Sequence, residues 1–164
     1  MKILLVRHGQ ADSNNIDAER KLTPQGRSDI QKIGKLLPGS SWNITRIFSS
    51  PLVRASETAQ ILSEIYSDKT KHNVPPEQKT FLSPGNPINN IDSLLEGMGP
   101  SDAAVWVFHM PDLAELASRF TGLKPSSFYV TPGTVIALNV PVKTYINNSM
   151  MVFMMQPEQL AELV

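Results

Sequence analysis

The sequence predicts an α/β fold, a three-layer αβα sandwich whose central sheet is mostly parallel with an antiparallel edge strand. Residues 3–6 form a continuous apolar run, which is typical of a strand buried on both faces of a parallel sheet. Further apolar runs alternate with helical patterns along most of the chain, as in α/β proteins. The last third differs, because the apolar runs 134–140 and 150–155 flank Asn147 and Asn148 and predict two strands joined by a turn.

Two helices carry clear start signals. Thr23 is the expected N-cap of the first helix, Pro24 its first residue, and Pro38 the residue that ends it. Ser50 and Pro51 repeat this pattern and predict the start of the second helix. The other elements are expected in this order: strand 46–49, the second helix to about residue 66, a loop at 72–78, a short strand at 79–82, a helix at 88–97, a strand at 103–108, a helix at 111–120 and a closing helix at 157–163.

The composition limits the class of protein. The chain of 164 residues is long enough to bury its own core, so we expect a single domain, 1–164. Fifteen Lys and Arg balance fifteen Asp and Glu, which argues against a nucleic-acid or membrane partner. The absence of cysteine excludes disulfides, thiolate catalysis and Cys-based metal sites. No apolar stretch is long enough for a signal peptide or a membrane span, so we expect a cytoplasmic monomer.

Polar residues follow three of the predicted strands at the point where each strand ends. In open α/β sheets, ligands bind in the crevice beyond the carboxyl ends of the strands. We therefore expect these side chains to share one crevice: Arg7, His8 and Gly9 after the first strand, Ser49, Ser50 and Arg54 after the second, and His109 after the third.

These residue types fit a phosphoryl group. Arg54 lies in the first turn of a helix, where a cation opposes the helix dipole, so a role in binding an anion is favoured. Arg7 and Arg54 offer planar forks that match phosphate oxygens. A neutral histidine can attack phosphorus, and Gly9 lets the backbone pass close beside such a nucleophile. Because the arginines and His109 supply positive charge and hydrogen bonds, we expect no cofactor and no metal.

The sequence resembles the histidine phosphatase superfamily, the phosphoglycerate mutase-like proteins with an Arg-His-Gly motif. The resemblance covers nearly the whole chain and implies a phosphoglycerate mutase-like fold. It also implies that His8 accepts the phosphoryl group, while Arg7, Arg54 and His109 bind it and neutralise its charge. It rests on four segments: Arg7-His8-Gly9, Leu22-Thr23-Pro24-Gln25-Gly26, Ser49-Ser50-Pro51-Leu52-Val53-Arg54-Ala55-Ser56-Glu57-Thr58-Ala59, and Phe108-His109-Met110-Pro111.

Within that superfamily, the small chain is most similar to the SixA-type phosphohistidine phosphatases. The similarity includes Gln10 and Ala11 after the glycine, and Arg20 shortly before the first helix. The pair Val107 and Phe108 is bulkier than the family usually has before its second histidine, which places the setting of that histidine and the width of the pocket in question.

The stretch in which mutase-like relatives carry an acidic residue holds none in this chain. Residues 81–87 contain no carboxylate, and the next ones, Asp92 and Glu96, fall on a predicted helix. An alkoxide leaving group needs a proton from a positioned acid, whereas the imidazole that leaves phosphohistidine is far less basic. The sequence therefore favours phosphohistidine over a phosphate ester as substrate.

Five further polar residues have open roles. Arg20 lines either the phosphate site or a partner surface, or is an exposed loop arginine. Asn14 falls where many mutase-like relatives have a phosphate-contacting asparagine. Asp12 and Asp112 are alternative distant acids, although a loop or helix start also accounts for them. His72 lies in a proline-rich loop and is interpreted as a surface residue.

Three functions remain open from the sequence. The leading hypothesis is a metal-independent phosphatase whose partner is a phosphorylated, histidine-containing protein of a phosphorelay or of carbohydrate phosphotransfer. The second is a phosphatase for a small phosphorylated substrate, either a phosphomonoesterase or a pyrophosphate-cleaving enzyme. The third is a catalytically weak phosphate-binding module.

Overall fold

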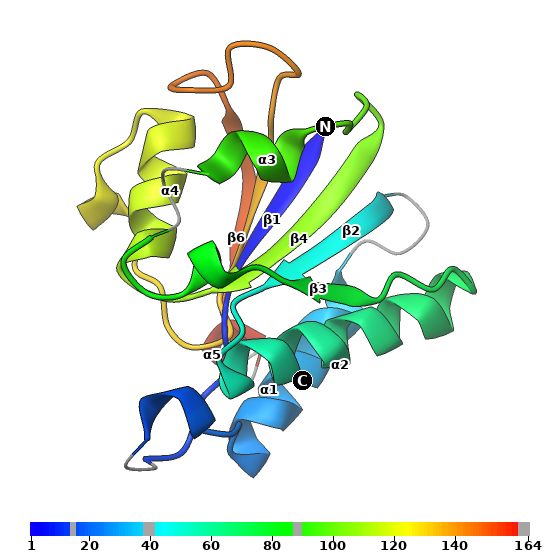
Figure 1. Ribbon diagram of the computed structural model, residues 1–164, viewed down its shortest axis with the longest axis vertical. Coiled ribbons are helices and arrows are strands. Elements are labelled where there is room, and N and C mark those ends of the chain that lie inside the picture. The colour runs from blue at the N-terminus through cyan, green and yellow to red at the C-terminus, as the bar shows by residue number, and fades with distance from the viewer. Residues whose placement is uncertain (14–15, 38–41, 87–89, 161–164) are drawn as a thin grey trace.

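The computed structural model describes residues 1–13, 16–37, 42–86 and 90–160 and contains a six-stranded sheet in the order β3-β2-β4-β1-β5-β6 (Figure 1). The pattern of apolar runs locates all its strands except β3. The strands are β1 (Lys2–Arg7), β2 (Asn43–Ser49), β3 (Pro76–Gln78), β4 (Asp102–Phe108), β5 (Val135–Asn139) and β6 (Met150–Met155).

The sheet is mostly parallel, as predicted. Strands β3, β2, β4 and β1 run in the same direction, and β5 is antiparallel to both β1 and β6. The antiparallel strand is therefore β5, which lies next to the edge, and the edge strand itself is β6. Strands β5 and β6 are consecutive in the chain and are joined by residues 140–149, and two consecutive antiparallel strands pair directly without a crossover connection.

Helices cover both faces of the sheet and complete the three layers. One apolar cluster joins α1, α2 and α5 to the sheet, and another joins α3 and α4 to the opposite face (Figure 1). Among the described residues, no helix has the length and apolar character needed to cross a membrane. The helices are α1 (Pro24–Leu36), α2 (Val53–Thr70), α3 (Ile91–Leu95), α4 (Asp112–Thr121) and α5 (Pro157–Leu160), with 3-10 turns η1 (Asp17–Glu19), η2 (Thr80–Leu82) and η4 (Pro125–Ser127).

The start signal of the first helix is confirmed and that of the second is wrong. The Thr23 side chain accepts a hydrogen bond from the Gly26 amide at 3.0 Å and caps α1. Ser50 does not cap α2, because its amide still donates to the Val107 carbonyl of the sheet at 2.9 Å. The helix consequently begins at Val53 and continues to Thr70, beyond the predicted end.

The region after α2 also differs from the prediction. The proline-rich stretch contains strand β3, and the predicted strand 79–82 contains the 3-10 turn η2. Pro76 is tolerated because β3 lies at the sheet edge, where a missing amide costs no ladder bond. The predicted helices 88–97 and 157–163 are confirmed over 91–95 and 157–160, while 38–41, 87–89 and 161–164 lie outside the described residues.

Candidate functional site

The parallel strands bring the predicted residues to one edge of the sheet. Arg7 of β1 pairs with Phe108 of β4, so His8 and His109 leave adjacent strands at the same level. Strand β2 lies on the other side of β4 and ends at Ser49. The two histidine rings have centroids 5.1 Å apart and are tilted by 55°.

The hydrogen bonds of His8 fix which of its nitrogens is free to react. Its Nδ1 lies 2.8 Å from the Gly9 carbonyl oxygen, and because a carbonyl only accepts, Nδ1 carries the proton. Its Nε2 then keeps a lone pair, which accepts a hydrogen bond from Arg54 Nε at 3.2 Å. This tautomer provides Nε2 as a nucleophile beside a guanidinium.

Both histidines are neutral at physiological pH. Burial is the main cause that lowers the pKa of His8 to about 4; the hydrogen bond with the Gly9 carbonyl opposes this shift, and the charges of Arg54 and Arg7 add to it. Burial also lowers the pKa of His109 to about 3, with a smaller contribution from His8. A neutral His8 keeps the lone pair that nucleophilic attack requires.

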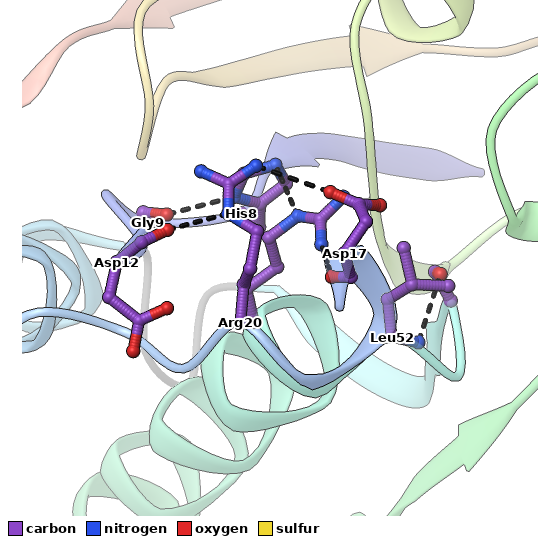
Figure 2. A network of polar contacts seen from close by, with 8 residues as sticks. His8, Gly9, Asp12, Asp17, Arg20 and Leu52 are labelled. Carbon is purple, nitrogen blue, oxygen red and sulfur yellow. Dashed lines mark hydrogen bonds and ion pairs between the residues drawn. The ribbon is translucent and has the colours of Figure 1, made fainter. Parts of the chain in front are cut away.

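Three cations surround His8, and Asp17 contacts two of them. Arg54, whose side chain is 5% exposed, donates from Nη1 to the Asp17 carbonyl at 2.6 Å and from Nη2 to Asp17 Oδ2 at 3.0 Å. Arg20 donates from Nη1 to Asp17 Oδ1 at 3.2 Å and from Nε to the Asp12 carbonyl at 2.5 Å (Figure 2). These contacts hold both guanidinium groups in place.

The third cation, Arg7, is anchored by its Nη1, which donates to the Val130 carbonyl at 2.8 Å. Its Nε and both ring nitrogens of His109 are buried and have no hydrogen-bond partner within the described residues. Buried polar atoms without a protein partner are uncommon and mark a site where a ligand can bind. They belong to a pocket of about 330 Å³, lined by Arg7, His8, Gln10, Ala11, Arg20, Arg54, Pro84, His109, Met110 and Pro132.

A network of short contacts holds the turn after β1. The Gly9 amide donates to Thr58 Oγ1 at 3.0 Å, and this hydroxyl donates to the Arg54 carbonyl at 2.7 Å. A Cβ at Gly9 would lie 2.9 Å from Ile30 and 3.1 Å from the Gly26 carbonyl. Glycine is required here because α1 packs directly against the turn that carries His8.

The bulky pair before the second histidine does not line the pocket. Val107 and Phe108 are both fully buried, and they pack into the apolar clusters on opposite faces of the sheet. His109 still lines the pocket.

The residues with open roles differ in whether they line the pocket. Arg20 lines the pocket, whereas Asn14 lies outside the described residues. Asp112 is buried and accepts a hydrogen bond from the Gly85 amide at 2.8 Å, which ties the 83–86 loop to the start of α4. Asp12 contributes its carbonyl to Arg20, and its side chain does not line the pocket.

Asp92 and Glu96 lie at the opposite end of the sheet. Together with Met1, the residue before β1, they border a separate surface hollow. Asp92 accepts a hydrogen bond from the Tyr145 hydroxyl, and the Glu96 carbonyl accepts one from Arg46. Neither carboxylate can act at the histidine pair.

Sequence reasoning missed Asp17. The available signal was its spacing from Arg20, since an acid and a base three residues apart face each other on a helical turn. Its contact with Arg54, 37 positions away, had no local signature.

Residues 3–74 match the model of the histidine phosphatase superfamily (branch 1). This segment contains four of the residues that line the pocket, namely Arg7, His8, Arg20 and Arg54. This matched segment, somewhat less than half of the chain, is similar to the histidine phosphatase superfamily. The matched segment also contains α1, the connection from β2 to α2 at residues 49–53, and α2 itself. The second histidine, His109, lies beyond it.

Curated relatives match about half of this chain. The Pgam5 serine/threonine-protein phosphatase of Caenorhabditis elegans is 39% identical over 87 residues, which are 52% of this chain and 28% of that protein. Its Xenopus tropicalis counterpart is 36% identical over 87 residues, 52% of this chain and 30% of that protein. The chain thus covers less than a third of these relatives.

Solved structures share the fold over nearly the full length. The protein histidine phosphatase SixA complexed with tungstate superposes with a TM-score of 0.81 at 22% identity, covering 98% of this chain and 99% of that one. A Plasmodium falciparum phosphoglycerate mutase superposes with a TM-score of 0.60 at 19% identity, covering 93% and 88%. The predicted phosphoglycerate mutase-like fold is confirmed.

Proposed function

We propose that the protein is a metal-independent phosphatase that removes the phosphoryl group from phosphohistidine in a partner protein, through a covalent intermediate on His8. One observation carries the proposal. His8 Nε2 keeps a lone pair, which accepts a hydrogen bond from Arg54 Nε. The pocket around it is lined by Arg7, Arg20, Arg54 and His109, and no carboxylate is among the described residues that line it.

The chemistry takes place in two displacements. In the first, His8 Nε2 forms a bond to phosphorus while the bond from phosphorus to the substrate imidazole nitrogen breaks. In the second, a water oxygen forms a bond to phosphorus, the bond to Nε2 breaks, and inorganic phosphate leaves with a proton released to solvent. Arg7, Arg54 and His109 stabilise the charge on the phosphoryl oxygens in both transition states.

The pocket lining favours an N-phosphoryl substrate. An alkoxide leaving group has a conjugate acid near that of water, about 15.7, and needs a proton from an enzyme acid. An imidazole has a conjugate acid near about 6.5, and a ring protonated on its other nitrogen leaves as neutral imidazole without further help. A pocket without a carboxylate is therefore suited to phosphohistidine.

A second candidate is a phosphatase for phosphoserine or phosphothreonine in proteins. It is favoured by the 39% identity to Pgam5 of Caenorhabditis elegans over 87 residues, which are 52% of this chain. This reaction requires an acid from the substrate, from solvent or from a residue that does not line the pocket in this structure. A small phosphate ester is a third possible substrate with the same requirement.

Substrate profiling with chelator present tests the proposal. Purified protein is assayed with EDTA on a chemically phosphorylated histidine protein, a phosphothreonine peptide and p-nitrophenyl phosphate. We expect kcat/KM on phosphohistidine to exceed that on both esters by at least about 100-fold, since no pocket acid assists the esters. Faster ester hydrolysis, or loss of activity with EDTA, would contradict the proposal.

Two histidine variants provide the matched control. His8→Asn removes the nucleophile, and His72→Asn changes an exposed histidine outside the pocket. We expect an acid-labile, base-stable phosphoryl label on the native protein and on His72→Asn, and none on His8→Asn. A native protein that binds phosphate but neither labels nor hydrolyses would instead support a binding module.

A further inference from the structure

The carboxylate of Asp17 bridges two of the arginines that line the pocket, although Asp17 itself does not line it. Oδ2 contacts Arg54 at 3.0 Å and Oδ1 contacts Arg20 at 3.2 Å, so one negative charge serves both cations (Figure 2). The Asp17 side chain is 62% exposed, and the Arg54 side chain is 5% exposed. The carboxylate thus lies on the solvent side of a buried guanidinium.

Asp17 does not have to leave when a phosphoryl group binds. A guanidinium has five N–H donors, and the contacts of Arg54 with His8 and Asp17 use three of them. The remaining donors, and the Nε–H that now faces His8, are available to phosphate oxygens. A bound phosphate and the Asp17 carboxylate would then share one guanidinium and repel each other.

The charge of Asp17 also reaches the pocket interior. It raises the pKa of His109, opposing burial and the nearby cations, which together lower that pKa. The electrostatic potential where a phosphoryl group would bind therefore depends on Asp17 as well as on the three arginines.

We infer that Asp17 is the counter-anion of the pocket, a positioning residue whose negative charge weakens phosphate binding by Arg54 and Arg20 so that inorganic phosphate is released. The inference rests on the proposed function, since it takes a phosphoryl group as the occupant. Strong, uniform binding of substrate and product does not raise turnover, and a shared anion limits the affinity while keeping both arginines in place.

Two possible roles for Asp17 predict opposite changes in phosphate affinity when its charge is removed. If it acts through its charge, the neutral Asp17→Asn variant binds phosphate more tightly, because the amide oxygen still accepts from Arg54 while the repulsion is gone. If it only orients Arg54 and Arg20, losing the ionic contacts loosens them and weakens phosphate binding.

Calorimetric titration with inorganic phosphate at low salt separates these roles and requires no catalysis. We expect Asp17→Asn to lower the Kd for phosphate about tenfold, a difference that shrinks as salt is added. NMR titration is expected to show a lower pKa for His109 in the same variant. If the native protein has no phosphatase activity but Asp17→Asn changes the phosphate Kd and the pKa of His109 in this way, the proposed function is refuted. The role of Asp17 as counter-anion is then still supported.

Two further variants control for charge and for folding. Glu19→Gln removes the same charge from an exposed position on the same 3-10 turn, and we expect its Kd to stay within about twofold of the native value. Asp17→Glu keeps the charge and is also expected to stay within about twofold. An unchanged or higher Kd in Asp17→Asn, or an equal effect of Glu19→Gln, would overturn the inference.

Discussion

At the scale of single residues, the histidine pair couples the candidate site to stability. The pKa of His8 is about 4 and that of His109 about 3 in the fold, against about 6.5 for an unperturbed histidine. The unfolded chain therefore binds more protons than the folded chain between pH 6.5 and these values. The stability linked to the pair is fully present above pH 6.5 and is lost as the pH falls toward 3.

We therefore expect the free energy of unfolding to decrease when the pH is lowered from 7 to 5. Urea denaturation at several pH values measures this slope. The double variant His8→Asn/His109→Asn is expected to lose most of it, and His72→Asn to retain it, because His72 is exposed. An equal slope in all three proteins would show that the pair is not responsible.

At the scale of elements, the packing of α1 against the turn after β1 sets the position of His8. Gly26 lies in the first turn of α1, and a Cβ there would lie 2.1 Å from the Gln10 carbonyl oxygen and 2.8 Å from the Gln10 nitrogen. Backbone atoms cannot move aside as a flexible side chain can. The approach of the two segments therefore requires glycine at this position.

We predict that Gly26→Ala destabilises the protein by about 1–3 kcal/mol and lowers phosphate affinity, since Gln10 is two residues from His8. Helix propensity alone predicts the opposite sign, because alanine in a helix is favoured over glycine by about 1 kcal/mol. Urea denaturation and phosphate titration measure the two effects.

Gly34→Ala is the matched control in the same helix. Its Cβ would meet the end of the Ile65 side chain at 2.7 Å, which can rotate away, so we expect a smaller cost. Equal destabilisation by the two substitutions would mean that the close approach to Gln10 has no special role.

At the scale of the whole molecule, two apolar clusters hold the sheet between its helices. Phe120 of α4 is fully buried in one cluster, with its ring centroid 6.1 Å from Trp106 and 5.5 Å from Tyr145. Phe120→Ala is predicted to cost about 3–5 kcal/mol of stability, because it removes a large buried ring. Tyr129→Ala, at a side chain that is 77% exposed, should change stability by less than about 0.5 kcal/mol in the same urea measurement.

Much of the fold followed from local patterns. The apolar run 3–6 marked the central strand β1, and Thr23 with Pro24 marked the start of α1. The strand β3 was missed because three residues with one proline carry too little periodicity. Helix α2 begins later than predicted because the Ser50 amide still forms a hydrogen bond with the Val107 carbonyl of the sheet.

The sequence by itself determined which chemical groups end the strands, since residue types and local periodicity depend only on neighbouring positions. Arg7, His8, Arg54 and His109 were all identified in this way. Only the tertiary structure decided that β2, β4 and β1 are neighbours, that His8 keeps its lone pair on Nε2, and that Asp17 bridges two arginines. Strand order, burial and ion pairs join residues that are far apart in the chain, and only the packed core brings them together.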